Sequence, residues 1–222
     1  MDKQDKRAFK NQLYEQFSRI GKALASPHRL ELLEVLAQCE RTVEALARET
    51  GQSVANASQH LQVLRAARLV ETRREGTSIY YRLASESVST LWLSLRTVGE
   101  AHLAEINRVV ETFLQDRAHW QPITAEALLE ELRSDQVILL DVRPVEEYQA
   151  GHLPQALSIP VEELEARLSE VPLDKEIIAY CRGPYCVFAD EAVALLRARG
   201  YHAQRLEEGL PDWRTLGLPI EV

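Results

Sequence analysis

The sequence predicts two domains of different fold class, an α+β domain followed by an α/β domain with a mainly parallel sheet. Up to about residue 115, apolar residues recur at helical spacing around one hairpin. After about residue 122, short buried strands alternate with helices. The 222 residues suffice for two hydrophobic cores. We expect domains at 1–117 and 124–222, with a linker at 118–123.

The first half begins with a series of short helices. Apolar residues from Phe9 to Leu24 predict one helix, and Ser26-Pro27 marks the start of a second. A third helix fits Val43 to Glu49, and Ser53 can cap a fourth that runs to about Ala67. Two short helices separated by a glycine-containing turn are typical of a helix-turn-helix.

A hairpin and a long helix complete this half. The alternating segments LVETRR and SIYYRL, joined by Glu75-Gly76-Thr77, predict a β-hairpin. From Ser85 to about Gln115 the apolar pattern predicts one extended helix. It has more apolar positions than a small domain can cover, so we expect a second copy of the chain to cover them in a homodimer.

The second half alternates helices and strands. ITAEALLEEL predicts a capped helix, QVILLDVR and KEIIAYCR predict buried strands, and CVFADEAVALLRARG predicts a helix that ends at Gly200. This order is typical of an α/β unit.

Charge is divided unevenly along the chain. The net charge is −8, but residues 1–120 carry 17 Lys and Arg against 15 Asp and Glu. Five arginines between Arg65 and Arg82 face only Glu71 and Glu75, which favours phosphate binding, although such a cluster can also be a solvated surface. No apolar run approaches the roughly 18 residues of a membrane helix, and the start lacks a signal-peptide core. We expect a cytoplasmic protein without membrane partners.

LASPHRLELLEVLAQ and the following segment from Thr42 to Leu83 resemble the winged helix-turn-helix of the ArsR/SmtB family of bacterial repressors, over about residues 18–84. The resemblance implies a homodimer that binds double-stranded operator DNA, with the fourth helix in the major groove and the hairpin as a wing. Polar side chains on that helix can reach base edges, and hairpin arginines suit phosphates. The expected DNA-binding residues are Ser53, Asn56, Ser58, Gln59, His60, Arg65, Arg73 and Arg74.

Metal sensing, common in that family, is not expected here. Thr42 and Glu44 occupy the positions where the family carries thiolates, which disfavours soft metals. The last helix offers ligand types without the usual spacing, at Glu100, His102, Asp116 and His119. Cys39 is interpreted as a small buried apolar residue. We expect no metal and no cofactor.

DVRPVEEYQAGHLPQALSIP, AYCRGPYCVFADEAVALLRARGY and EEGLPDWRTLGLPIEV resemble, in family order, a complete rhodanese domain over about residues 122–222. The resemblance implies sulfurtransferase chemistry, in which Cys181 takes a sulfane sulfur from a small donor as a persulfide and passes it to a thiol acceptor. Asp141, Arg143 and His152 would brace the active loop, and Trp213 would lie in the core.

The position of Cys181 supports a reactive thiolate. It follows a buried strand and opens a tight loop before a helix, so amide groups and the positive helix end converge on its sulfur, and Arg182 can add to them. Gly183 and Pro184 shape the turn. The active-site loop comprises Arg182, Gly183, Pro184, Tyr185, Cys186 and Val187.

Two loop positions separate alternative chemistries. A phosphatase loop needs an arginine where this chain has Val187, so phosphoryl transfer is disfavoured. Cys186 either resolves a Cys181 persulfide, through a disulfide or a bridging polysulfide, or only fills space.

The two halves together predict a dimeric transcription regulator with a rhodanese input domain. One alternative is a sulfurtransferase enzyme with an auxiliary DNA-binding domain. A second is a repressor that responds to metal or arsenic through Cys181 and Cys186.

Overall fold

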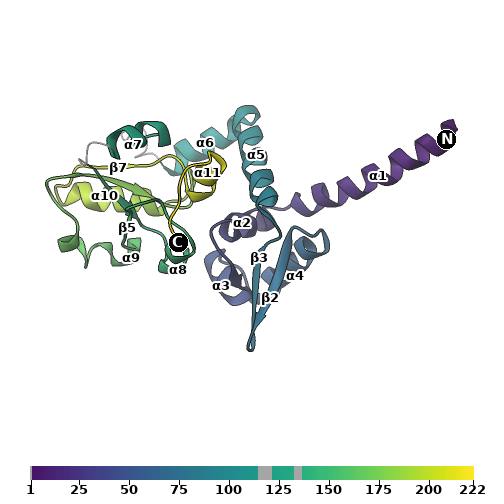
Figure 1. Ribbon diagram of the computed structural model, residues 1–222, viewed down its shortest axis with the longest axis horizontal. Coiled ribbons are helices and arrows are strands. Elements are labelled where there is room, and N and C mark those ends of the chain that lie inside the picture. Colours follow the sequence, from purple (N-terminus) through teal and green to yellow (C-terminus); the bar gives the residue numbers. More distant parts are fainter. Residues whose placement is uncertain (1, 115–121, 133–136) are drawn as a thin grey trace. The chain divides into compact units, whose positions relative to one another are not determined.

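The computed structural model of the chain describes residues 2–114, 122–132 and 137–222 (Figure 1). It divides into two compact units, Met1–Trp92 and Leu93–Val222. Most of the predicted linker, residues 118–121, lies outside the described residues. Among the helices that the structure describes, none is long and apolar enough to cross a membrane.

The first unit contains four helices, a three-stranded antiparallel sheet in the order β1-β3-β2, and the start of a fifth helix. Its elements are α1 (Lys3–Leu24), α2 (Pro27–Leu36), β1 (Arg41–Thr42), α3 (Val43–Glu49), α4 (Val54–Ala66), β2 (Val70–Glu75), β3 (Ser78–Leu83) and α5 (Glu86–His102). The predicted helices and hairpin are confirmed. The two-residue strand β1 was too short for the sequence pattern to indicate.

Local chemistry explains where the central helices begin. The Thr42 hydroxyl accepts from the Ala45 N–H at 3.3 Å, and Ser53 caps α4 by accepting from the Asn56 N–H at 3.2 Å. Leu61 and Leu64 of α4 are fully buried in one core with Leu46 of α3. Burial of these leucines fixes the helix-turn-helix and leaves the opposite face of α4 in solvent.

The single helix predicted for residues 85–115 is wrong. The structure has two helices, α5 and α6 (Ala104–Phe113), separated by Leu103 with φ −114° and ψ 92°. The last turn of α5 closes with a 2.8 Å bond from the Leu103 N–H to the Gly99 carbonyl. A Cβ on Gly99 would lie 3.1 Å from Ile106 Cδ1, so the glycine permits Ile106 to fold back over α5.

The second unit contains a four-stranded parallel sheet in the order β5-β4-β6-β7, in agreement with the predicted α/β class. After α6 its elements are α7 (Ala125–Leu132), β4 (Val137–Asp141), α8 (Val145–Ala150), β5 (Leu157–Ser158), α9 (Val161–Leu164), the 3₁₀ helix η2 (Leu168–Glu170), β6 (Glu176–Tyr180), α10 (Phe188–Ala198), β7 (Ala203–Arg205) and α11 (Leu210–Thr215).

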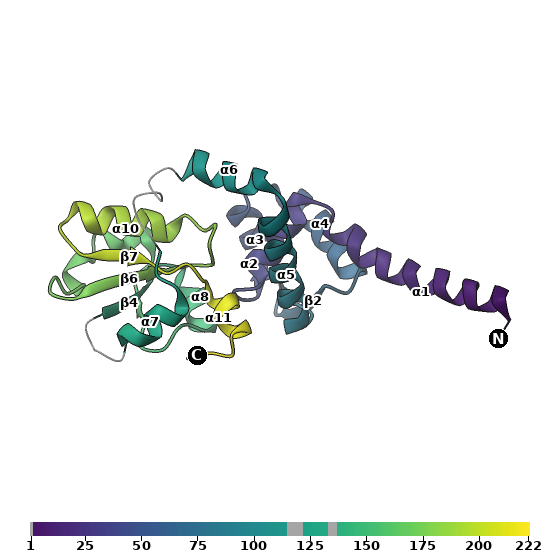
Figure 2. The ribbon, with the colours of Figure 1, turned by 90° about the horizontal axis from the view of Figure 1, so that it is seen from above.

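Helices cover both faces of this sheet. Ala192 and Leu196 of α10 pack on one face, whereas Leu128 of α7 and Trp213 of α11 pack on the other (Figure 2). Both faces of the sheet are therefore shielded from solvent, and the strand sequences are continuous apolar runs, as expected for parallel sheets. Ligands of such sheets bind at the carboxyl ends of the strands, and Cys181 follows directly after the carboxyl end of β6.

Candidate functional site

The active-site loop runs from Cys181, directly after β6, to Val187, which precedes the first turn of α10. Cys181 is 2% exposed and belongs to the core cluster beneath α10. Its sulfur lies 3.4 Å from the Cys186 carbonyl oxygen and 3.9 Å from that of Gly183. The loop therefore places two of its carbonyl oxygens against the Cys181 sulfur.

Two glycines allow this tight wrapping. Gly183 has a φ of 155°, a conformation that side chains disfavour. Gly209, which precedes α11, lies so close to the loop that an added Cβ would be 2.1 Å from the Arg182 carbonyl oxygen. Any side chain at residue 209 would displace the loop. The sequence analysis did not single out Gly209, because only the folded chain brings it to residue 182.

The surroundings of Cys181 favour its thiolate. Burial alone would raise its pKa, but a hydrogen bond from the Cys186 thiol, backbone hydrogen bonds from Ala189 and Gly183, and the charge of Arg205 together hold the pKa below its usual value. A thiolate is the nucleophilic form of cysteine. Cys181 thus has the electrostatic properties expected of a reactive loop cysteine.

Cys186 shows the opposite shift. Its hydrogen bond to Cys181, its own burial and the negative charge of the Cys181 thiolate raise its pKa well above the usual value. The two cysteines thus form one hydrogen-bonded pair, in which the pKa of Cys181 is lowered and that of Cys186 is raised.

The cation near Cys181 comes from a residue that sequence reasoning missed. Arg205 ends β7, is 3% exposed and pairs with Ala179 in the strand register. Its guanidinium lies 3.4 Å from the Pro184 carbonyl oxygen and 3.6 Å from Asp190. No local motif marks Arg205, because it reaches the loop only through the pairing of β6 with β7.

Arg182, which sequence reasoning placed near the thiolate, forms an ion pair elsewhere. Its guanidinium contacts the fully buried Glu147 of α8 at 2.5 Å and lies over the Phe188 ring. This pair ties the loop to α8. Val187 is exposed and uncharged, so the loop has no cation at the position where a phosphatase loop would need arginine.

The residues expected to brace the active-site loop, Asp141, Arg143 and His152, make their contacts around the segment that follows β4. Asp141 and Arg143 form a fully buried ion pair at 2.6 Å, and Arg143 also donates to the Gly151 carbonyl at 2.9 Å. His152 stacks on Tyr148. Trp213 is a core residue whose indole N–H donates to the Pro219 carbonyl at 2.8 Å.

A cavity of about 420 Å³ lies beside the loop within the second unit. Pro184 and Tyr185 of the loop border it, together with Arg205 and the part of α5 that belongs to this unit. The Tyr185 hydroxyl donates to Glu100 at 2.7 Å, and Arg96 forms an ion pair with Asp212 of α11. Both contacts join the loop region to α5 and were not foreseen from sequence.

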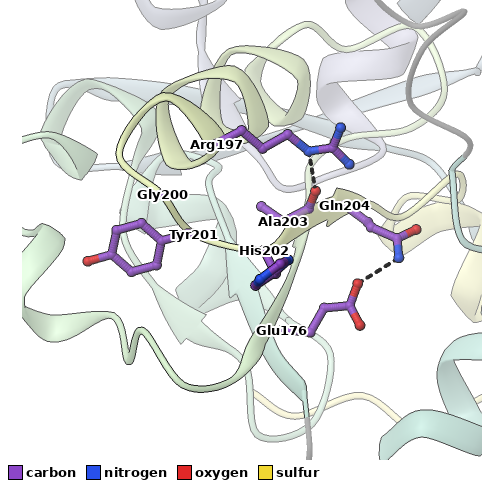
Figure 3. Close-up of a pocket in the computed structure, with 7 residues that line it drawn as sticks. All are labelled: Glu176, Arg197, Gly200, Tyr201, His202, Ala203 and Gln204. Carbon is purple, nitrogen blue, oxygen red and sulfur yellow. Dashed lines mark hydrogen bonds between the residues drawn. The ribbon is translucent and has the colours of Figure 1, made fainter.

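A second hollow of about 480 Å³ lies at the other ends of the strands (Figure 3). Glu176 at the start of β6 accepts from Gln204 at 2.6 Å, and Arg197 donates to the Ala203 carbonyl at 2.7 Å. These contacts use polar groups of the hollow within the fold itself. It is also remote in topology from Cys181, which follows the carboxyl end of β6.

Three of the predicted DNA-binding side chains make contacts inside the first unit. Ser53 caps α4, and Asn56 donates to Gln52 at 3.1 Å. The His60 ring lies 5.3 Å from that of His28 of α2 in a tilted arrangement, and its pKa is lowered by burial and by the neighbouring His28 and Arg29. His60 therefore favours the neutral form and a packing role.

Of the other five predicted residues, four are exposed and Ser58 is half-buried. Gln59 and Arg65 are exposed on α4. Arg74 is exposed on β2 and donates to the Gly76 carbonyl at 3.2 Å. Arg73 pairs with Glu40 at 2.5 Å and lies over the Tyr80 ring. The hairpin thus presents one arginine in a local turn contact and one in an ion pair.

Across the described parts of the chain, no group of three or more His, Cys, Asp or Glu side chains is placed to hold a metal ion. Asp116 and His119, weighed above as ligand types, lie outside the described residues. Cys39 is half-buried just after α2.

Comparison with known proteins agrees with both halves. Residues 26–72 match the profile of bacterial regulatory proteins of the arsR family, and residues 124–216 match that of the rhodanese-like domain. The HTH-type transcriptional regulator Rv0324 of Mycobacterium tuberculosis is 46% identical over 94% of this chain and 92% of its own length. The chain belongs to the ArsR family. It carries a C-terminal rhodanese domain.

Two further relatives each match one half. A sulfurtransferase of Allochromatium vinosum is 34% identical over 44% of this ArsR-family chain and 92% of its own length. A solution structure of a homodimeric winged helix-turn-helix domain from Mycobacterium bovis is 49% identical, covers 42% of this chain and 87% of its own, and has a TM-score of 0.41.

Proposed function

We propose that this ArsR-family chain is a dimeric DNA-binding transcription regulator whose rhodanese domain forms a persulfide on Cys181 and so senses or transfers reactive sulfur. The observation that carries the proposal is the environment of Cys181. Hydrogen bonds from Cys186, Ala189 and Gly183, together with the charge of Arg205, lower its pKa despite burial. A thiolate in this setting attacks a sulfane sulfur of a small donor, and the donor fragment leaves.

DNA binding is supported by the surface of α4 and the hairpin. Gln59 and Arg65 are exposed on the helix that follows the helix-turn-helix turn, and Arg74 is exposed on β2. Gln can pair with adenine in the major groove, and arginines suit backbone phosphates. Ser53, Asn56, Ser58, His60 and Arg73 remain proposed contacts, although a contact by Asn56, His60 or Arg73 requires its present interaction to open.

Dimerisation is supported by apolar side chains of α1 and α5 that are exposed in the single chain. Phe9, Tyr14 and Phe17 of α1 are more than half exposed. Leu95 and Val98 of α5 are also exposed. Aromatic residues repeated along one helix are expensive to leave in water, so a second copy of the chain is the proposed cover.

A route from sulfur chemistry to the dimer is supported inside the second unit. The Tyr185 hydroxyl of the active-site loop donates a hydrogen bond to Glu100 of α5, and Arg96 of α5 forms an ion pair with Asp212 of α11. A sulfur added to Cys181 would change the loop that carries Tyr185. The proposed consequence is a shift of α5 and, through the dimer, a change in operator affinity.

The test is DNA binding with and without inorganic polysulfide. The operator would be selected by the purified protein from a random DNA library, and affinity would be measured for wild type, Cys181→Ser and Cys39→Ser. We expect polysulfide to change the affinity of wild type and Cys39→Ser but not that of Cys181→Ser. Identical responses of all three proteins would refute the proposal.

A second candidate function is a sulfurtransferase enzyme with an auxiliary DNA-binding domain. It is favoured by the similarity of the second half to the Allochromatium vinosum sulfurtransferase. Steady turnover of thiosulfate with cyanide at ordinary enzymatic rates, unchanged by operator DNA, would support it over the regulator.

A further inference from the structure

The two loop cysteines differ in a way that persulfide formation on Cys181 would reverse. In the resting pair, Cys181 has the lowered pKa and Cys186 the raised one. Their thiols are hydrogen-bonded to each other, and the Cys181 sulfur rests 3.4 Å from the Cys186 carbonyl oxygen. The two thiols therefore lie within hydrogen-bonding reach of each other, which a bond between the sulfurs requires.

We propose that Cys186 resolves the Cys181 persulfide, releasing hydrogen sulfide and leaving a Cys181–Cys186 disulfide. This inference rests on the proposed function, because it requires that Cys181 first carries a sulfane sulfur. By this reaction, each sulfur that Cys181 takes up produces one disulfide across the loop, and the loop must be reduced before it can react again.

The reaction balances without another reactant. Cys186 loses its thiol proton, and its sulfur attacks the inner sulfur of the persulfide, the Sγ of Cys181. The bond between that Sγ and the outer sulfur breaks, and the outer sulfur leaves as hydrosulfide and takes up the proton as hydrogen sulfide. The outer sulfur is reduced to sulfide, while the two cysteine sulfurs become the oxidised disulfide pair.

The order of steps follows from the causes of the Cys186 shift. Of the three causes that raise the pKa of Cys186, two depend on Cys181, namely the hydrogen bond to its sulfur and repulsion by its charge. Once the Cys181 sulfur is bonded to a second sulfur, its charge is neutralised or moved one atom outward. Both contributions to the raised pKa of Cys186 then weaken, which favours attack by Cys186 after loading over attack before it.

The surrounding loop supports closure rather than simple packing. Cys186 is half-buried just before α10, and its N–H donates to the Gly183 carbonyl at 3.2 Å, which keeps both loop ends together. A residue that only filled space would not need to share a hydrogen bond with the reactive sulfur.

The experiment treats the reduced full-length protein with limiting inorganic tetrasulfide. Intact-protein and peptide mass spectrometry and a sulfide assay follow wild type, Cys186→Ser, Cys181→Ser and Cys39→Ser. The serine at residue 186 keeps a hydroxyl that can donate to the Cys181 thiolate, so loading continues. The comparison uses the lifetime of the persulfide after loading, which does not depend on the loading rate.

We expect wild type and Cys39→Ser to lose two hydrogens per chain and release one sulfide, with residues 181 and 186 joined. Cys186→Ser should retain one added sulfur on Cys181, with a lifetime longer by about tenfold or more. Equal persulfide lifetimes in wild type and Cys186→Ser overturn the inference, as does a trisulfide bridge without sulfide release. Failure of Cys186→Ser to take up sulfur at Cys181 instead overturns the proposed function.

Discussion

Arginines have opposite roles in the two units. On the hairpin of the first unit, Arg73 and Arg74 are exposed. In the second unit, Arg143 is fully buried with Asp141, and Arg205 is buried beside Asp190. The same side chain is therefore a surface charge on the hairpin and, at residues 143 and 205, a structural and electrostatic part of the second unit.

The difference shows which charges are available to a partner. An exposed ion pair contributes about 0–1 kcal/mol, so a DNA phosphate can replace its carboxylate at little cost. A buried arginine cannot leave without stranding a carboxylate in the core. The hairpin arginines can thus bind DNA, whereas the buried ones fix the loop around Cys181.

The largest expected effect is a loss of stability when the buried ion pair between Asp141 and Arg143 is broken. Arg143→Met leaves Asp141 charged and unpaired at 0% exposure, which should destabilise the second unit by about 3–5 kcal/mol. The measurement is urea unfolding followed by amide hydrogen exchange in β4 and β6. The control is Arg199→Met, which removes a surface partner of Glu165 and should cost about 1 kcal/mol or less. Equal losses in the two variants would contradict the comparison.

The next effect concerns reactivity. Arg205 lowers the pKa of Cys181, so Arg205→Met should raise that pKa and move the pH profile of alkylation by iodoacetamide to higher pH. At a pH below the pKa, the thiolate fraction falls about tenfold for each unit by which the pKa rises, and the alkylation rate falls with it. Peptide mass spectrometry distinguishes Cys181 from the other two cysteines.

Two variants separate electrostatics from packing at residue 205. Arg205→Lys keeps the positive charge and should restore most of the wild-type pH profile, while Arg199→Met should leave the profile unchanged. A folded Arg205→Met protein with the wild-type profile would show that Arg205 only braces the loop carbonyls.

Much of the fold was predictable because its signals are local. The bounds of α3 and α4, the Ser53 cap and the hairpin each depend on neighbouring residues, and the structure confirms them. The break at Leu103 was missed because the apolar spacing continues through it. What interrupts the helix is the contact of Ile106 with Gly99, which sequence periodicity cannot show.

The site divides in the same way. Cys181 and its loop follow from a strand, a turn and a helix that are contiguous in sequence. Arg205 reaches the loop through the pairing of β6 with β7, and Gly209 reaches it because the start of α11 approaches the loop. Both residues lie at least 24 positions after Cys181 in the sequence. Arg182 has the right charge for the thiolate, but the buried Glu147 binds it.

The smallest effect tests the exposed arginines. Arg74→Ala should weaken operator binding uniformly across sequences, by about threefold to tenfold at physiological salt, and reduce the slope of log affinity against log salt by about 1. Arg73→Ala should cost less, because Arg73 must first leave Glu40 and Glu75 before it meets a phosphate.

A sharper test removes the carboxylate that competes with DNA phosphate for Arg73. Glu40→Gln removes the charge that Arg73 pairs with, so it should tighten DNA binding and make the subsequent loss of Arg73 as costly as the loss of Arg74. Arg167→Ala, on a surface pair of the rhodanese domain, is the control and should change nothing. If Glu40→Gln leaves affinity and salt slope unaltered, Arg73 is a structural partner of Glu40 and not a DNA contact, and the division between exposed and buried arginines must be redrawn within the hairpin itself.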